Sequence, residues 1–399
     1  MPIGKNKKGF CKKGIGKGMK VLITGAGGFI GKNLVAALQN IRDGKDKTTV
    51  LPSDLTIYTF DVDTDRALLD TYCADCDFVF NLAGVNRPEN PKDFMAGNFG
   101  FASQLLDTLK AHGNTCPVML SSSTQAALQN PYGESKRAGE ELFFRYAKET
   151  GAKVLVYRFP NVFGKWCRPN YNSAVATFCH NIANGLPITV NDRNHPMTLV
   201  YIDDVVAELL AALSGKETRD GDYCRVPTEH HALLGEIADL LYAFKESREN
   251  HYVPDMTEGS LSKKLYSTYL SYLPTDGFAY PLEMHTDARG SFTEILRTVG
   301  NGQFSVNISK PGITKGNHWH HTKNEKFLVV SGEGVIRFRK LGTAEVYEYF
   351  VSGDKLEVVD IPVGYTHNIE NLGDRDMVTF MWCNECFDPQ HPDTFQLDV

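Results

Sequence analysis

The fold of the first half of the chain is decided by one short stretch, Thr24-Gly25-Ala26-Gly27-Gly28-Phe29-Ile30-Gly31. It follows an apolar run (20–24), which predicts a buried strand, and it opens a helical pattern from Phe29 to Leu38. Glycines at 25, 28 and 31 allow a tight turn, a close approach of the pyrophosphate to the backbone, and close packing of the helix on the strand. The helix N-terminus then faces the phosphates. The stretch therefore predicts a dinucleotide site on a strand–turn–helix unit.

Strand-like and helix-like segments alternate from this stretch to about residue 240. Such alternation predicts an α/β fold with a Rossmann-like, doubly wound parallel sheet. From Leu282 onward, short runs of Phe, Val, Ile and Tyr are instead broken by Gly, Pro and Asn, which is typical of an all-β barrel or sandwich. We therefore expect four regions: a tail (1–18), a dinucleotide-binding domain (19–250), a connecting region (251–281) and an all-β domain (282–399).

Composition excludes several classes of protein. The 399 residues suit two domains, 42% of them are hydrophobic and 23% charged, and the net charge is −6. No apolar run reaches the roughly 18–20 residues that span a bilayer, and the total charge gives no nucleic-acid signature. We expect neither membrane insertion nor nucleic-acid binding.

The first 18 residues differ from the rest because they contain six lysines and no acid. A basic arm for nucleic acid or membrane is one interpretation. The favoured one is a disordered tail, with Met19 as the real start just before the first strand. Of the nine cysteines, the pairs Cys73/Cys76 and Cys383/Cys386 lie in different halves, so a shared zinc site is not favoured. Reduced thiols in a cytoplasmic protein are expected.

An acid, Asp61, stands at the end of the second predicted strand (55–60). A carboxylate there accepts hydrogen bonds from ribose hydroxyls and repels a 2′-phosphate. Asp61 therefore favours NADH over NADPH by a small margin, and the nearby Arg66 acts in the opposite direction.

A proton-transfer pair is predicted on the helix that begins at Pro131. Tyr132 and Lys136 are four residues apart and so share one face. We expect the ammonium to lower the pKa of the phenol, which then exchanges a proton with a sugar hydroxyl or ketone while a nicotinamide exchanges a hydride. Upstream, a strand ends in Ser121, Ser122 and Ser123, and Ser123 is the favoured group to hold the carbonyl oxygen.

These residues resemble the short-chain dehydrogenase/reductase superfamily, in its extended, nucleotide-sugar-modifying branch. The resemblance implies that Leu82, Ala83 and Gly84 help to bind the cofactor, which would be NADPH with NADH as the alternative. It also implies that Asn161, Asn172 and Arg193 lie near a nucleotide-sugar pocket. The match rests on the glycine stretch, Asn81-Leu82-Ala83-Gly84, the three serines, YGESK (132–136) and Tyr201-Ile202-Asp203-Asp204-Val205.

Four residues of the second half have the spacing of metal ligands: His318, His320, Glu325 and His367. His and Glu ligands suit zinc or another divalent ion with an open position. The spacings resemble the two motifs of the cupin superfamily, although the loop before Pro362 is longer than the family pattern. The alternative is a row of polar side chains without a metal. His320 is the least certain ligand because a second histidine follows it directly.

An extended reductase fused to a metal cupin resembles the bifunctional epimerase–reductases of capsular N-acetyl-L-fucosamine synthesis. The resemblance implies a UDP-2-acetamido-2,6-dideoxy-hexos-4-ulose substrate, epimerised at carbon 3 by the cupin and then reduced at carbon 4. Lys310, Lys315 and His320 stay open as the base, and the resemblance to cupins implies a homo-oligomer. The alternatives are a single-function enzyme whose cupin serves only for dimerisation, and a dinucleotide sensor, which would not need the Tyr/Lys pair.

Overall fold

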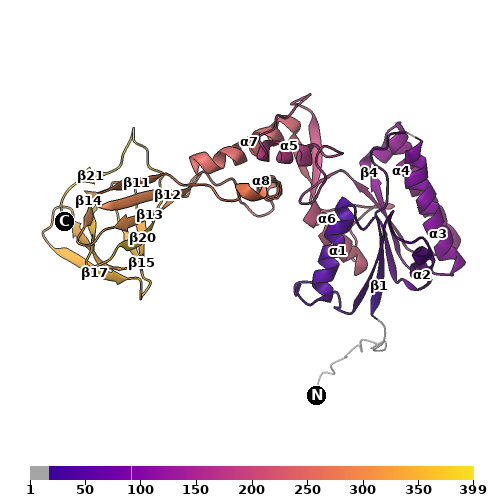
Figure 1. The fold of residues 1–399 in the computed structure, drawn as a ribbon, viewed down its shortest axis with the longest axis horizontal. Helices are drawn as coiled ribbons and strands as arrows, with labels where there is room; N and C mark the ends of the chain where they lie inside the picture. Colours follow the sequence, from indigo (N-terminus) through magenta and orange to yellow (C-terminus); the bar gives the residue numbers. More distant parts are fainter. Residues whose placement is uncertain (1–17, 91) are drawn as a thin grey trace, which may run out of the picture. The chain divides into compact units, whose positions relative to one another are not determined.

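The computed structural model describes residues 18–90 and 92–399, which divide into two compact units (Figure 1). The first comprises the chain up to His180 together with Ile188–Ile237. The second comprises Asn181–Pro187 together with Ala238–Val399. The basic tail expected over 1–18 lies, except for Gly18, outside the described residues. None of the described helices is long and apolar enough to cross a membrane.

The first unit is built on a seven-stranded sheet with the order β2-β1-β3-β4-β5-β9-β8. All neighbouring strands are parallel except β8 and β9, which confirms the predicted doubly wound architecture. The chain reverses its direction of winding between β1 and β3, where open parallel sheets bind their ligands. The strands are β1 (Met19–Thr24), β2 (Leu55–Phe60), β3 (Phe78–Asn81), β4 (Val118–Ser123), β5 (Val154–Phe159), β8 (Arg219–Asp220) and β9 (Tyr223–Cys224).

Helices cover both faces of this sheet (Figure 1). One core joins α1 and α6 to the sheet through Leu34, Leu38 and Leu209. A second core joins α2, α3 and α4 to the opposite face through residues such as Leu105 and Phe143. The helices are α1 (Phe29–Arg42), α2 (Ala67–Asp75), α3 (Phe101–Ala111), α4 (Pro131–Thr150) and α6 (Ile202–Leu213).

A small three-stranded sheet, β10-β7-β6, was not anticipated from the sequence. Its strands are only three to six residues long and lack a clear alternating pattern, so periodicity gives no signal for them. The elements are β6 (Asn161–Phe163), β7 (Pro196–Tyr201) and β10 (His230–Leu233), with α5 (Ala174–Ala183) and α7 (Leu234–Asn250) next to them in the chain.

The second unit contains two antiparallel sheets, which confirms the predicted all-β architecture. Their orders are β11-β12-β13-β20-β15-β18 and β17-β16-β19-β14-β21. Phe327, Ile336, Phe338 and Ile369 from both sheets form one buried core. The strands are β11 (Met284–Asp287), β12 (Gly290–Thr298), β13 (Gly302–Ser309), β14 (Thr314–Trp319), β15 (Glu325–Ser331), β16 (Glu333–Lys340), β17 (Val346–Ser352), β18 (Val358–Ile361), β19 (Tyr365–Asn371), β20 (Met377–Cys383) and β21 (Phe395–Gln396).

The segment expected to connect the two domains is itself structured. It contains α8 (Leu261–Leu270) and a short 3-10 helix, η3 (Thr275–Gly277). Ser260 caps α8, since its side chain accepts a hydrogen bond from the backbone N–H of Lys263, and Leu265 and Tyr269 are buried. The segment therefore packs as part of the second unit.

Gly31 gives a test of the close packing at the start of α1. A Cβ at this position would lie 2.2 Å from the carbonyl oxygen of Gly25. We expect G31A to lower the free energy of unfolding by about 1–3 kcal/mol in urea titrations, because backbone must move to relieve the overlap. The control is G139A inside α4, where a Cβ meets nothing closer than 3.8 Å and should be neutral or slightly stabilising. Equal losses in both variants would contradict this view of the turn.

Candidate functional site

The glycine turn between β1 and α1 leaves the start of the helix open. Gly25 has a φ of +67°, and a Cβ on it would lie 2.6 Å from the backbone nitrogen of Ala83. Gly28 occupies the N-cap position of α1, and no side chain caps the helix there. Phe29 and Ile30 pack against the sheet core. The first N–H groups of α1 are thus available for an anion, as the sequence predicts.

The ends of β1 and β3 are held side by side by Thr24. Its hydroxyl donates to Oδ1 of Asn81 at 2.7 Å and accepts from the backbone N–H of Ala83 at 3.4 Å. The backbone N–H of Leu82 donates to the carbonyl of Thr24 at 3.1 Å. Further along, a Cβ on Gly84 would come within 3.2 Å of Nζ of Lys136. The structure therefore brings these predicted cofactor residues into one region beside the Tyr/Lys helix.

Asp61 reaches the glycine turn from the end of β2. Its Oδ2 accepts a hydrogen bond from the backbone N–H of Gly27 at 2.6 Å. Both residues line an open cleft that also includes Lys32 and Arg168. The carboxylate stands where an adenosine ribose is expected, and its charge repels a 2′-phosphate. Lys32 and Arg168 in the same cleft would attract that phosphate.

The Tyr132/Lys136 helix is fixed at its first turn. Oδ1 of Asn130 accepts a hydrogen bond from the backbone N–H of Gly133 at 2.8 Å, and Pro131 occupies a position in the first turn that suits proline. A Cβ on Gly133 would lie 2.3 Å from the carbonyl oxygen of Gln125, so α4 packs directly on the short 3-10 helix η2 (Thr124–Ala127). Ser123, which precedes η2, is thereby placed next to Tyr132.

The two side chains of the pair form hydrogen bonds with other residues. The Tyr132 hydroxyl donates to Oδ1 of Asn86 at 3.1 Å, and Nζ of Lys136 donates to the carbonyl of Ser121 at 3.1 Å. Burial raises the pKa of Tyr132, against a hydrogen bond with Ser123 that lowers it. The expectation that the pKa of Tyr132 is lowered is therefore wrong for the arrangement described. Burial also lowers the pKa of Lys136 to about 8. The phenol is held in its proton-donating form.

Two asparagines near the pair were missed by the sequence analysis. Oδ1 of Asn86 accepts the hydrogen bond from the Tyr132 hydroxyl. Asn98 is buried in a short π-helix, η1 (Met95–Gly100), and its side chain binds the backbone N–H and carbonyl of Val85 and the hydroxyl of Ser135. It thus ties the segment after β3 to α4. The signal that could have found Asn86 is a polar residue close after a predicted buried strand, whereas no local pattern points to Asn98.

The three predicted sugar-pocket residues are exposed and lie outside the main sheet. Nδ2 of Asn161 on β6 donates to the carbonyl of Thr198 at 3.1 Å. Nη2 of Arg193 approaches the carbonyl of Gly235 at 3.4 Å. Asn172 lies in the segment between β6 and α5. Their contact with a sugar nucleotide stays a prediction.

The four predicted metal ligands meet in the all-β unit. The ligand atoms of His318, His320, Glu325 and His367 all lie within 4.8 Å of one another. β14 pairs with β19 so that His318 stands opposite His367, and Glu325 begins β15. His320, expected to be the least certain ligand, is part of the group and is only 2% exposed.

Three of the four ligand residues have buried atoms without another partner, which is the state that suits a metal. Oε2 of Glu325 lies 3.5 Å from Nε2 of His320 and 3.3 Å from Nε2 of His367. These separations allow charge attraction, yet none of the three buried atoms has a hydrogen-bond partner among the described residues. Buried polar atoms without partners are costly, so the residues present fit a divalent cation.

The protonation states of the group also favour metal binding. Burial, followed by the nearby His367, lowers the pKa of His318 to about 4, so its imidazole is neutral at neutral pH. Burial by itself raises the pKa of Glu325, but His320, His367 and Lys323 hold it well below its usual range. Nδ1 of His320 is hydrogen-bonded to the carbonyl of Asp393, which leaves its Nε2 as the ligand atom.

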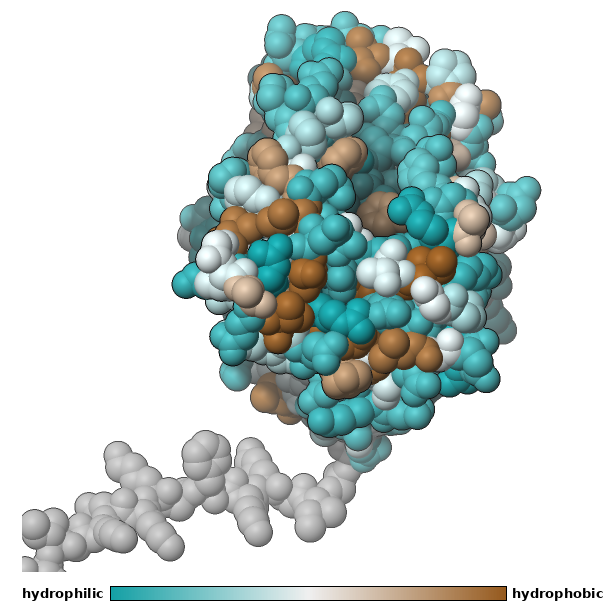
Figure 2. All heavy atoms as spheres, turned by 90° about the vertical axis from the view of Figure 1, so that its left-hand side faces the viewer, coloured by the Kyte–Doolittle hydropathy of each residue, from teal (hydrophilic) through white to brown (hydrophobic). Residues whose placement is uncertain are grey.

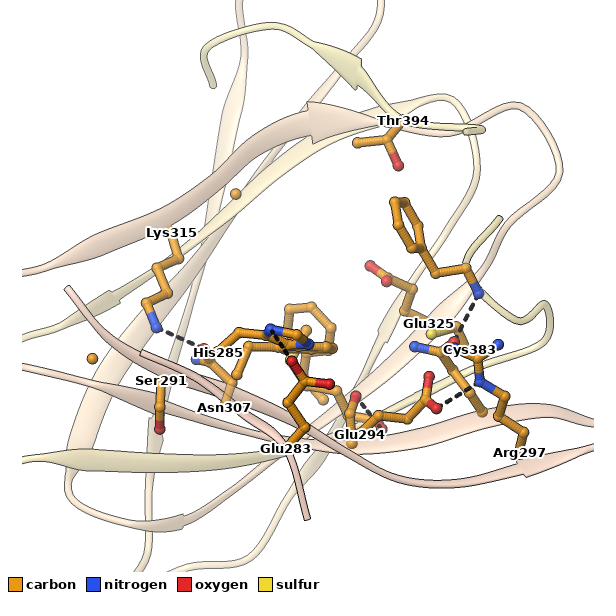
Figure 3. Close-up of a pocket in the computed structure, with 18 of the residues that line it drawn as sticks. Glu283, His285, Ser291, Glu294, Arg297, Asn307, Lys315, Glu325, Cys383 and Thr394 are labelled. Atoms are coloured by element: carbon orange, nitrogen blue, oxygen red, sulfur yellow. Dashed lines mark hydrogen bonds and ion pairs between the residues drawn. The ribbon is translucent and has the colours of Figure 1, made fainter. Parts of the chain in front are cut away.

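A cavity of about 990 Å³ opens onto this group (Figure 3). Its walls include His318, Glu325 and His367 together with Lys315 and Lys323. The cavity has room for a hexose beside the ligands. In Figure 3, Lys315 extends to Asn307, whereas Glu325 comes from a different wall.

Comparisons with known proteins agree with both units. Residues 21–223 match the model of the NAD dependent epimerase/dehydratase family, and residues 285–395 match that of a polysaccharide biosynthesis C-terminal domain. The chain is 43% identical over 381 residues to the UDP-2-acetamido-2,6-beta-L-arabino-hexul-4-ose reductase of Pseudomonas aeruginosa, covering 96% of this chain and 99% of that protein.

Solved structures give the same result. The capsular polysaccharide assembling protein CapF from Staphylococcus aureus superposes with a TM-score of 0.88 at 56% identity, covering 96% of this chain and all of that one. The UDP-glucuronic acid 4-epimerase of Bacillus cereus, solved with NAD, covers 64% of this chain and 98% of its own at 22% identity and a TM-score of 0.50. The latter shows the likeness of fold alone.

Asp61 gives a test of cofactor choice. D61N keeps an acceptor for Gly27 but removes the charge, so we expect the ratio of kcat/KM for NADPH to that for NADH to rise about tenfold or more. Steady-state kinetics with both cofactors measure this ratio. D63N is the matched control, since Asp63 lines the same cleft and is exposed. A ratio that D61N leaves unchanged would show that this carboxylate does not set the choice.

Asp393 gives a test of how the metal ligands are positioned. Its carboxylate accepts hydrogen bonds of 2.8–2.9 Å from the backbone N–H groups of residues 321–323, directly after His320. We expect D393A to weaken zinc binding by about 10–100-fold, because the turn that orients His320 loosens. Zinc retained after dialysis against graded chelator measures this. D388A, which removes a carboxylate that caps only its own local turn, should bind zinc as the unaltered chain does.

Proposed function

Because the chain belongs to the NAD dependent epimerase/dehydratase family, we propose that it is a nucleotide-sugar enzyme in which a 3-epimerase and a 4-ketone reductase share one polypeptide. The observation that carries this proposal is the presence of two complete sites. A Tyr/Lys pair stands beside a dinucleotide turn in one unit, and in the other a group of four metal-ligand residues lies at a cavity that three of them line. Neither site has an evident structural role.

The substrate follows from the relatives. The Pseudomonas aeruginosa protein is named as a reductase of UDP-2-acetamido-2,6-beta-L-arabino-hexul-4-ose, and the Staphylococcus aureus protein as one that assembles capsular polysaccharide. We assign this chain a UDP-2-acetamido-2,6-dideoxy-hexos-4-ulose as substrate. Epimerisation at carbon 3 and reduction at carbon 4 then give UDP-2-acetamido-2,6-dideoxy-β-L-talose, a step towards UDP-N-acetyl-L-fucosamine.

Reduction uses the first unit. A bound NAD(P)H supplies the hydride for carbon 4 of the sugar. The Tyr132 phenol, kept protonated by its burial, donates its proton to the ketone oxygen. Ser123 stands beside it as a hydrogen-bond donor to the same oxygen, and the Lys136 ammonium stabilises the phenolate that remains. Asp61 favours NADH and the family resemblance favours NADPH, so the preferred cofactor is open to the kinetic test above.

Epimerisation uses the second unit. A divalent metal, zinc from the character of its ligands, would be held by His318, His320, Glu325 and His367, and would polarise the 4-ketone. That polarisation acidifies the proton on carbon 3, which a base in the cavity can then remove. Burial keeps His318 neutral and so available as a ligand.

A homo-oligomer in the cytoplasm suits this assignment. The strand β17 lies at the edge of its sheet, and Val346, Tyr347, Tyr349 and Phe350 on it are exposed. Figure 2, which looks onto the all-β unit, shows apolar side chains in several patches on this face. An exposed apolar edge strand supports pairing with a second copy. The free cysteines of the described chain fit a reducing compartment.

The second candidate is a reductase alone, with the all-β unit serving only for dimerisation. The exposed edge of β17 favours it, and the buried, unpartnered ligand atoms speak against it. A purely structural core would gain stability from apolar residues in their place.

Two variants separate the proposed activities. In D₂O, the unaltered chain should place deuterium at carbon 3 of the UDP-4-keto sugar without NAD(P)H and reduce it when the cofactor is added, as followed by NMR. Y132F should keep deuterium uptake but reduce about 100-fold or more slowly. H318A should lose deuterium uptake and zinc but still reduce the sugar when it is supplied already inverted at carbon 3. No deuterium uptake by the unaltered chain, or full reduction by Y132F, would overturn the proposal.

A further inference from the structure

The strand β14 carries a β-bulge between Lys315 and His318. In its pairing with β19, Lys315 stands opposite Ile369 and Gly316 opposite Asn368, but the next pair is His318 with His367. Asn317 is therefore an extra residue in β14. It has a φ of +57°, and its Oδ1 accepts a hydrogen bond from Nδ2 of Asn368 at 2.8 Å, which holds the bulge in place.

The bulge decides which way Lys315 faces. In a regular strand, residues three apart point to opposite sides of the sheet. Asn317 has no partner on β19, so Lys315 and His318 pair with Ile369 and His367, which are two residues apart. Residues two apart on a strand point to the same side, and Lys315 and His318 therefore do so as well. Two steps separate them by about 7 Å along the strand. Both residues line the cavity that opens onto the metal ligands.

The head group of Lys315 is fixed but has no ion pair with any residue that the structure describes. Its Nζ donates to Oδ1 of Asn307 at 2.8 Å (Figure 3). It also donates to the carbonyl of Ile308 at 2.8 Å. Among residues 18–90 and 92–399, the cavity's other Lys and Arg side chains each pair with a carboxylate: Lys323 with Glu325, Arg289 with Asp287 and Arg297 with Glu294. Of the Lys and Arg side chains that line the cavity, Lys315 therefore loses the least electrostatic stabilisation when it is deprotonated.

The charges around Lys315 agree with this. Burial lowers its pKa; Asp287 on β11 raises it, and Arg289 in the turn before β12 lowers it. Asn307, on β13, and Ile369, on β19, are the uncharged neighbours. A lysine in such surroundings reaches the neutral, proton-accepting form at a lower pH than one in water.

The other two candidate bases are placed elsewhere. Lys310 is exposed, its Nζ pairs with Asp376 at 2.8 Å, and it does not line the cavity. His320 has both ring nitrogens committed, Nδ1 to the carbonyl of Asp393 and Nε2 to the ligand group.

We propose that Lys315 is the base that removes the proton from carbon 3 of the 4-keto sugar, an inference that rests on the proposed epimerase function. The lone pair of neutral Nζ forms an N–H bond with the hydrogen of carbon 3 as the C3–H bond breaks. The electrons of the C3–H bond form the C3–C4 double bond, and the π electrons of the ketone move to O4. Water then returns a proton to the opposite face of carbon 3 as the enolate collapses to the ketone. The lysine releases its proton to solvent, so nothing is consumed.

Two substitutions separate a base from a fixed positive charge. K315M removes both, whereas K315R keeps the charge and a donor for Asn307 but stays protonated at every accessible pH. Deuterium uptake at carbon 3 is measured by NMR in D₂O without NAD(P)H, on zinc-loaded full-length chain, from pH 6 to 10. Zinc content and reduction of the sugar already inverted at carbon 3 are measured on the same samples. K310M is the matched control, because Lys310 lies outside the cavity.

We expect K315M and K315R both to slow deuterium uptake about 100-fold or more, with zinc content and reduction unchanged. The rise of the rate with pH that a neutral lysine gives should disappear in both variants, and ethylamine should restore part of the rate in K315M but not in K315R. Uptake in K315R within threefold of the unaltered chain would overturn the proposal, as would an unchanged pH profile in either variant. Absence of uptake in the unaltered chain would instead refute the epimerase function itself.

Discussion

The close approach of two backbone segments controls the first unit. Gly25 and Ala83 are so near that a Cβ on Gly25 would overlap the backbone after β3, and Gly31 is equally close to Gly25. This contact sets the angle at which α1 leaves the sheet and opens the helix N-terminus towards the cleft. It also places Gly84 against Lys136. The segment after β3 therefore contacts the dinucleotide turn on one side and the proton-transfer pair on the other. A hydride donor and a proton donor can act on one carbonyl only if they are held this close.

The second unit depends on a different constraint, a buried carboxylate. Glu325 is only 5% exposed and carries its charge among three histidines and a lysine. Taking a charge out of water is costly unless it is compensated. The compensation offered by the protein is incomplete, because Glu325 Oε2 has no hydrogen bond in the described residues. The barrel thus spends stability on a preformed set of ligands, and Asp393 fixes the turn that bears one of them.

Both sites use burial to set protonation states, and in both it disfavours the charged form of the buried group. In the first unit, burial keeps the Tyr132 phenol protonated, which prepares it to donate a proton to a ketone, and lowers the pKa of Lys136 to about 8. In the second, burial keeps His318 neutral and works against the charge on Lys315, which prepares one as a ligand and the other as an acceptor. The order of these chemistries, proton removal before reduction, is the one that a 4-keto sugar requires, since carbon 3 is acidic only while carbon 4 is a ketone.

The sequence by itself determined the elements and the kinds of chemistry. The glycine stretch, the helix over Pro131–Thr150 and the spacing of His318, His320 and Glu325 are local patterns, and local periodicity is enough to place them. Only the tertiary structure decided the partners. Asn98 meets Ser135 across 37 positions, Asp393 meets His320 across 73, and the bulge at Asn317 places Lys315 on the same side of its strand as His318. Such contacts, and the burial that reverses the expected pKa of Tyr132, come from packing between distant segments, which no local pattern records.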